Sequence, residues 1–388
     1  MVSLLSRIFI KDYNNYDDTS VRRKYGMLSS IVGIFLNILL FTFKYFAGIL
    51  SGSVAITADA FNNLSDAGSS IITLAGFKFT GRNADSEHPF GHGRGEYISG
   101  FIVSIVIILM GFELFTSSAS KILHPEKVDT SIMAFAVLVI SIVVKLYMAF
   151  YNTRIGRKIN SSAMKATATD SLSDSVATSV VFLSMLVMKY TGYNIDGYAG
   201  ALVAIFILFA GYSAAKDTIS PLLGTKPSKE IVDAIDGIIM SHDGILGVHD
   251  LIVHDYGPGR MIVSLHAEVP GNRNIYELHD LIDHIENDLD ERFNCECVIH
   301  MDPVDVEDER IITMKTGIEK ILHSIDDGLS IHDLRIVPCK DYDNIIFDMI
   351  VPPKYHNKDV IIKEQVCKEI EEKYPSYKAV IKIDKSYV

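Results

Sequence analysis

Long apolar runs alternate with short polar connections through the first 225 residues, and then they stop. Each run holds about 20 or more mostly apolar residues, enough to cross about 30 Å of hydrocarbon as a helix. The runs cover residues 26–50, 54–80, 97–118, 130–152, 164–189 and 197–215. The pattern predicts a six-span α-helical membrane domain over residues 1–225.

The periodicity changes after residue 226. Apolar residues follow helical spacing in "KEIVDAIDGIIM" and again in "IYELHDLIDHIENDLDERF". Between these two segments lie two strand-like runs joined by a Gly-Pro-Gly turn, and "CECVIHMDP" follows as a closing strand. This order of helix, strand, strand, helix and strand predicts a compact ferredoxin-like α+β module over residues 226–306.

Residues 307–388 echo that module. "SIHDLRIV" repeats "GVHDLIVH", and "AVIKIDKS" repeats "CVIHMDPV". The offset is 82 or 83 residues for four pairs: His249 and His332, His266 and Asp348, His300 and Lys382, Asp302 and Asp384. A near-constant offset predicts a second, degenerate ferredoxin-like repeat. Because Asp and Lys replace two histidines, we expect this copy to fold alike but to bind no metal at the corresponding site.

Charge divides at the same boundary. Residues 226–388 carry 33 acidic and 18 basic residues, a net of −15, and residues 1–225 are left with a net of +3. A strongly acidic block disfavours nucleic acid as a partner and suits cations.

Basic residues also predict the orientation in the membrane. They gather before the first span and around the loops after the second and fourth spans, whereas Ser51-Gly52-Ser53 has none and 119–129 has only Lys121 and Lys127. The bias places both termini in the cytoplasm of a multi-pass cell-membrane protein. The N-terminus shows no signal peptide. Lys44 and Lys145 are expected to extend from near span ends toward the membrane surface.

Polar side chains interrupt two of the apolar runs. Asn62 and Asp66 are spaced i, i+4 in "ADAFNNLSDA", and Asp170 and Asp174 have the same spacing in "TDSLSDS". This spacing puts each pair on one helix face. Helix–helix hydrogen bonding explains neighbouring Ser and Asn side chains. It does not explain three carboxylates, which repel one another in the membrane unless they are protonated or bridged by a cation.

The four side chains therefore predict an oxygen cage for a transported ion. Oxygen donors suit Mn²⁺ better than Zn²⁺, which gains from imidazole or thiolate ligands, and Fe²⁺ comes next.

At these residues the chain, from about 20 to 306, resembles the cation diffusion facilitator family of divalent-metal/proton antiporters, which work as homodimers. The resemblance implies a transport site at Asn62, Asp66, Asp170 and Asp174, and the Asn–Asp and Asp–Asp combination is similar to the manganese-exporting subgroup.

Two further metal sites follow from the resemblance. The loop "ADSEHPFGHGRGEY" offers a carboxylate and two imidazoles, Asp85, His88 and His92, which suit a metal by themselves. Five positions match the family's cytoplasmic regulatory site: His249, His266, His279, His300 and Asp302.

We therefore expect a Mn²⁺/H⁺ antiporter working by alternating access, with divalent metal ions, protons, the lipid bilayer and a second copy of the chain as partners. It needs no cofactor beyond transported and regulatory metal. Efflux of Fe²⁺ or Zn²⁺ is the alternative within this class. A membrane-anchored metal sensor or a metalloenzyme are the alternatives outside it, although no His-Glu-x-x-His pattern appears.

Overall fold

The computed structural model describes residues 2–16, 18–51, 54–82, 84–124, 131–339, 342–355 and 358–384. Of the residues used for the orientation, Gly52, Ser53 and Lys127 lie outside these ranges. The chain divides by its contacts into two compact units: Met1–Thr225 with Tyr256–Arg260, and Lys226–Asp255 with Met261–Val388.

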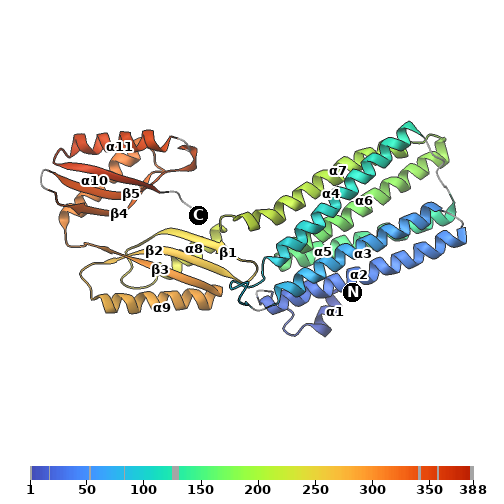
Figure 1. The fold of residues 1–388 in the computed structure, drawn as a ribbon, viewed down its shortest axis with the longest axis horizontal. Helices are drawn as coiled ribbons and strands as arrows, with labels where there is room; N and C mark the ends of the chain where they lie inside the picture. The colour runs from blue at the N-terminus through green and yellow to red at the C-terminus, as the bar shows by residue number, and fades with distance from the viewer. Residues whose placement is uncertain are drawn as a thin grey trace. The chain divides into compact units, whose positions relative to one another are not determined.

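Unit 1 is helical (Figure 1). Its helices are α1 (Val2–Phe9), α2 (Thr19–Ser51), α3 (Val54–Thr80), α4 (Gly95–Leu123), α5 (Ile132–Lys158), α6 (Ser162–Thr191) and α7 (Asp196–Leu223). They pack chiefly in the pairs α2–α3, α4–α7 and α5–α6. Within the described residues, five helices are long and apolar enough to cross a membrane: α2, α4, α5, α6 and α7. The predicted second span, α3, is helical over its 27 residues but is not among these five, so the six-span topology stays a prediction.

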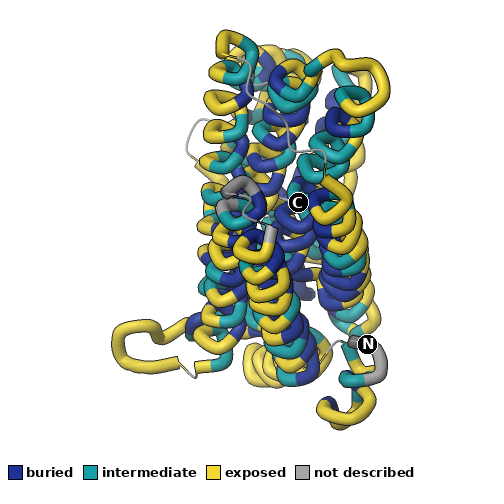
Figure 2. The backbone as a smooth tube through the Cα atoms, turned by 90° about the vertical axis from the view of Figure 1, so that its right-hand side faces the viewer, coloured by how far each residue is buried: buried dark blue, intermediate teal, exposed yellow. Residues whose placement is uncertain are grey.

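The long helices bury one side and expose the other, as the tube coloured by burial shows (Figure 2). Large apolar residues lie on the exposed sides, including Leu39, Leu109 and Phe209, as lipid-facing positions require. Gly26 lets α2 approach α3 closely, because a methyl group at that position would overlap the fully buried ring of Phe77.

A buried ion pair ties the start of α2 to the start of α4. The Arg22 guanidinium donates to both carboxylate oxygens of Glu96, and its Nε donates to the Ile159 carbonyl at 2.6 Å. The Glu96 side chain is fully buried. Because Ile159 lies between α5 and α6, Arg22 also holds the connection between these two helices. That connection positions α6, which begins at the Ser161 cap, where Oγ accepts from the Met164 amide.

Unit 2 contains two modules with the same element order. The first consists of α8 (Lys229–Met240), β1 (Gly247–Asp255), β2 (Met261–Pro270), α9 (Ile275–Phe293) and β3 (Cys295–Val304). The second consists of α10 (Glu309–Ile325), β4 (Ser330–Val337), β5 (Asp343–Ile350), the short 3₁₀ helix η1 (Pro353–Tyr355), α11 (Asp359–Lys373) and β6 (Tyr377–Asp384). Each sheet has three strands in sequence order, with an antiparallel pair followed by a parallel pair.

The modules also share a backbone irregularity. β1 bulges after His249 and β4 bulges after His332, and the next residue has a positive φ in both, 53° at Asp250 and 52° at Asp333. Since a positive φ is uncommon outside glycine, its recurrence at equivalent positions supports the internal repeat.

Each sheet buries one face against its own two helices and leaves the other face to polar side chains. Val263, Leu265 and Ala267 of β2 are buried in the first core, which also takes in residues of α8 and α9. Because side chains alternate along a strand, His266 lies on the opposite face, beside His300 of β3. The second module follows the same rule, with Phe347 in its core and Asp348 on the open face.

Candidate metal sites

The first candidate site lies between α3 and α6. The Oγ1 atoms of Thr73 and Thr167 are 2.9 Å apart in a buried hydrogen bond that joins these antiparallel helices. Seven residues from that contact along each helix, about 10 Å at 1.5 Å per residue, come Asp66 and Asp174. One oxygen of each of Asp66, Asp170 and Asp174 lies within 4.8 Å of the others. The three predicted carboxylates therefore form one cluster inside the helical unit.

A lysine from α5 occupies this cluster. The Lys145 ammonium lies 2.6 Å from an oxygen of Asp66 and 2.6 Å from an oxygen of Asp174. Lys145 is 2% exposed. A cation at this position offsets the mutual repulsion of the carboxylates, which is the role that a bound metal ion would have.

The expectation that Lys145 extends toward the membrane surface is therefore wrong. α5 continues to Lys158, so Lys145 lies thirteen residues from either helix end, about 20 Å, which its side chain cannot cover. Lys44 is also buried, and its ammonium pairs with Asp59 at 2.8 Å instead of reaching the surface.

The two asparagines of α3 are arranged differently. Asn63 is buried and its Nδ2 donates to Asp66 Oδ2 at 3.1 Å, whereas Asn62 is exposed. The Oδ1 atoms of Asn63 and Asp66 are both buried and find no hydrogen-bond partner among the described residues. Asn62 lies outside the cluster in this structure, and its assignment as a ligand stays a prediction.

The second candidate site is the loop between α3 and α4. Asp85 Oδ1 accepts hydrogen bonds from the amides of Glu87 and His88, at 3.0 and 2.7 Å, which folds the loop over the carboxylate. Asp85 lies 3.5 Å from ring nitrogens of both His88 and His92, and the two rings are 4.6 Å apart. The amide of His88, followed by that of Glu87, holds the pKa of Asp85 below its usual value. The loop thus brings the three predicted residues together with an ionised carboxylate.

The third candidate site lies on the open face of the first sheet in unit 2. His249 of β1 and His266 of β2 are cross-strand neighbours, and His266 pairs in register with His300 of β3. Asp302 is central to the group: its carboxylate oxygens lie 3.2 Å from His249 Nε2, 2.8 Å from His266 Nδ1 and 3.4 Å from His300 Nε2. Three imidazoles and one carboxylate form a donor set suited to a transition metal.

Two features refine this third site. Burial, and then the neighbouring His332 ring, lower the pKa of His249, which favours the neutral imidazole that binds metals. His279 does not join the group, because it lies exposed on α9 and pairs with Asp283 at 3.2 Å. Its assignment to this site stays a prediction.

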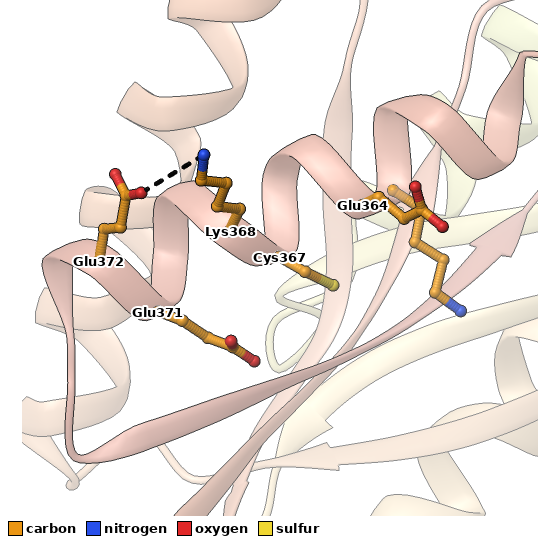
Figure 3. A pocket seen from close by; sticks show the side chains of 6 residues that line it. Glu364, Cys367, Lys368, Glu371 and Glu372 are labelled. Carbon is orange, nitrogen blue, oxygen red and sulfur yellow. Dashed lines mark ion pairs between the residues drawn. The ribbon is translucent and has the colours of Figure 1, made fainter.

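A shallow depression along α11 has none of these properties (Figure 3). Lys368 and Glu372 project from one side of the helix, 3.8 Å apart, and Cys367 and Glu371 project from the other. Burial raises the pKa of Cys367, so the thiol stays protonated. The side chains that line the depression come from a single helix and do not converge on a common point.

Comparison with known proteins bears on both units. The model of the cation efflux transmembrane domain matches residues 30–223, half of the chain, and the model of the cation efflux protein cytoplasmic domain matches residues 227–304. The chain belongs to the cation diffusion facilitator family. The resemblance seen in the sequence is thereby confirmed for the family, and the second module, residues 307–388, extends beyond both matched regions.

Relatives of this cation diffusion facilitator include transporters from archaea and bacteria. It is 32% identical to the uncharacterized transporter MJ0449 of Methanocaldococcus jannaschii over 280 residues, which cover 72% of this chain and 98% of that protein. It is 27% identical to the cation-efflux pump FieF of Salmonella choleraesuis and of Salmonella newport over 294 residues, which cover 74% of this chain and 96% of each pump. The chain is thus a cation efflux family transporter, and its long apolar helices make it a membrane protein.

Proposed function

We propose that this transporter exports Mn²⁺ in exchange for protons by alternating access, with Asp66, Asp170 and Asp174 as the ion's carboxylate ligands. One observation carries the proposal: carboxylates from two antiparallel helices converge on a buried ammonium group. A site that holds a cation between helices and contains only oxygen ligands around it suits a hard divalent ion.

Lys145 sets the charge balance for the proposed exchange of metal for protons. In the ion-free state the ammonium holds the carboxylates together, and an entering divalent ion displaces it. With Lys145 still charged nearby, three carboxylates leave a formal charge of −2, which one divalent ion or two protons balance. Protons arriving from outside therefore compete with the metal for the same oxygens, because ligation requires the deprotonated form.

The fourth ligand in this proposal is an asparagine of α3. Asn62 is the residue that the family resemblance favours, and Asn63 is the residue in contact with Asp66 in this structure. Either one supplies a neutral oxygen donor, which favours Mn²⁺ and then Fe²⁺ over Zn²⁺.

The remaining parts of the proposal follow the family resemblance. The chain crosses the cell membrane six times with both termini in the cytoplasm, and it acts as a homodimer, in keeping with the match to the family's cytoplasmic domain. Each module of unit 2 is a ferredoxin-like fold, a proposal that the shared order of elements supports. The first module's His249, His266, His300 and Asp302, joined by His279, bind a regulatory metal ion, and Asp85, His88 and His92 bind another in the loop.

Flux in proteoliposomes tests the transport site. We expect wild-type protein to move Mn²⁺ against an opposing proton gradient, and Asp66→Asn, Asp170→Asn and Asp174→Asn each to abolish most of the flux. Asp59→Asn is the matched control, because Asp59 is an aspartate of α3 that pairs with Lys44 outside the cluster. Competition with Fe²⁺, Zn²⁺ and Cd²⁺ in the same vesicles ranks the ions.

Two results would overturn the proposal. Undiminished Mn²⁺ flux in the three aspartate variants would remove the cluster from the transport path. Flux that ignores the proton gradient would remove the exchange, and a stronger flux of Fe²⁺ or Zn²⁺ would reassign the cargo within the same class.

A further inference from the structure

The two modules of unit 2 meet through the open faces of their sheets, at equivalent residues. The rings of His249 and His332, which occupy the same position in the two modules, lie 4.2 Å apart at an interplanar angle of 33°. Contact between equivalent residues is the hallmark of a two-fold interface, formed here inside a single chain. The second module thus places its own polar face next to the metal-binding face of the first.

A second cluster of possible ligands forms at this junction. One donor atom of each of His332, Asp348 and Asp384 lies within 4.8 Å of the others and of a carboxylate oxygen of Asp250, which comes from the first module. His332 Nε2 is 3.3 Å from Asp384 Oδ2 and 3.6 Å from Asp250 Oδ1. The set therefore draws three ligands from β4, β5 and β6, and one from β1.

The histidines at the junction point to an ion rather than to a packed core. The side chains of His249 and His332 are each 7% exposed, and their buried ring nitrogens have no hydrogen-bond partner among the residues that the structure describes. Asp384 Oδ2 is likewise buried without one within the described part of the chain, which ends at this residue. Buried polar atoms normally have partners, because leaving one unpaired costs about 1–3 kcal/mol. A metal ion bound by His332 and Asp384 would supply the missing interaction for these two residues.

Charge favours the same conclusion. Lys382 takes the place of His300, and its ammonium lies 2.7 Å from Asp348 and 3.6 Å from Asp384. It is one positive charge among three carboxylates, and its side chain is 66% exposed, so it can move into solvent when an ion arrives. Three carboxylates and one imidazole suit Mn²⁺ or Fe²⁺ better than a thiolate-seeking ion.

We propose that His332, Asp348 and Asp384 of the second module, completed by Asp250 of the first, bind a divalent metal ion that joins the two modules. The expectation that the second module binds no metal rested on its own residues alone, and the site needs Asp250 from the neighbouring module. Asp250 also links the two metal-binding groups, since its other oxygen lies 3.5 Å from His249 Nδ1. This binding site is separate from the transport cluster, so it stands whichever ion the transporter exports.

The test counts metal ions on the full-length protein in detergent. The purified protein is dialysed against Mn²⁺, and bound manganese per chain is measured by mass spectrometry for the wild type and for His332→Ala, Asp384→Asn and Asp250→Asn. We expect His332→Ala and Asp384→Asn to lose one ion per chain. Asp250→Asn should weaken binding of that ion by at least about 10-fold, because the loss of even a residue that only orients a ligand costs about 10–100-fold.

Two variants keep the result specific. Asp333→Asn changes the equivalent of Asp250 in the second module, where the carboxylate pairs with Arg335 at 2.7 Å, and it should retain the wild-type count. Lys382→His replaces the competing cation with the residue of the first module, so it should tighten Mn²⁺ binding without adding an ion.

Folding and function are read separately. His332→Gln accompanies His332→Ala, and the circular dichroism of both ion-free variants should match that of the wild type. A wild-type ion count in His332→Ala or Asp384→Asn, or an equal loss in Asp333→Asn, would overturn the proposal. The ion count tests this site, and Mn²⁺ flux tests the proposed function. An unchanged ion count in the variants would therefore leave the transport proposal standing, and an absence of Mn²⁺ flux would leave the ion count as it is.

Discussion

Replacing Lys145 by methionine tests how the transport cluster is held in the absence of an ion. The side chain keeps most of its length but loses the charged group that contacts Asp66 and Asp174 at 2.6 Å. Removing one partner of a buried ion pair costs about 3–5 kcal/mol, because the remaining charges are left uncompensated in a low-dielectric site. We expect the ion-free Lys145→Met protein to be destabilised by about this amount.

The same substitution should strengthen metal binding. In the wild type an entering ion displaces the ammonium, so part of the binding free energy is used for that displacement. Each 1.4 kcal/mol of avoided cost corresponds to about a tenfold change in affinity. Lys145→Met should therefore bind Mn²⁺ at least about tenfold more tightly and release it more slowly, which lowers turnover.

Thermal unfolding of the purified protein, titrated with Mn²⁺, measures both effects. The control is Lys121→Met, because the Lys121 ammonium pairs with Asp196 at 2.7 Å while 38% of the lysine side chain remains exposed. An exposed pair of this kind contributes about 0–1 kcal/mol. Equal destabilisation in the two variants, together with unchanged Mn²⁺ affinity in Lys145→Met, would refute the assignment of Lys145 as an internal counter-ion.

Two further predictions concern residues near the cluster and at the helix starts. Asn63→His should shift the ratio of Mn²⁺ to Zn²⁺ flux toward Zn²⁺ more than Asn62→His does, because Asn63 contacts Asp66 and imidazole suits Zn²⁺; identical ratios in both variants and the wild type would contradict the oxygen-donor account of selectivity. Glu96→Gln should lower the free energy of unfolding by about 3–5 kcal/mol, because it leaves the buried Arg22 guanidinium without its anion. Chemical unfolding in detergent measures that loss, and a change below about 1 kcal/mol would mean that the pair behaves like a surface one.

The sequence revealed the carboxylates of the Asp66, Asp170 and Asp174 cluster because helical spacing is a local property. Positions four residues apart share a face whatever surrounds the helix, so Asp170 and Asp174 could be grouped before their partners were known. Lys145 could not be placed in this way, since its contacts come from two other helices. In the predicted run 130–152 Lys145 lies seven residues before the end, and it is the continuation of the helix to Lys158 that puts it thirteen residues from either end.

The choice between Asn62 and Asn63 as the fourth ligand cannot be made from sequence spacing alone. Residues three and four positions before Asp66 both lie on its side of the helix, so the spacing fits Asn63 as well as Asn62. Packing against the other helices separates them, and it buries only Asn63. The junction of the two modules has the same character. Each module could be recognised from its own pattern, but the site at His332 and Asp250 needs the contact between the modules.

A lysine pairs with carboxylates in both the membrane cluster and the junction of the modules, and we infer from the difference in burial that the two proposed sites have different tasks. Lys145 is enclosed by its carboxylates, so displacing it costs several kcal/mol and keeps ion binding weak enough to reverse in each transport cycle. Lys382 is mostly exposed, so displacing it costs about 0–1 kcal/mol, and the junction can hold its ion through many cycles. In the proposals above, the ion at the membrane cluster has to leave in each cycle, whereas the ion that joins the two modules stays bound. The burial of Lys145 and the exposure of Lys382 therefore distinguish a site that would release its ion from one that would retain it, even though the carboxylate ligands are alike.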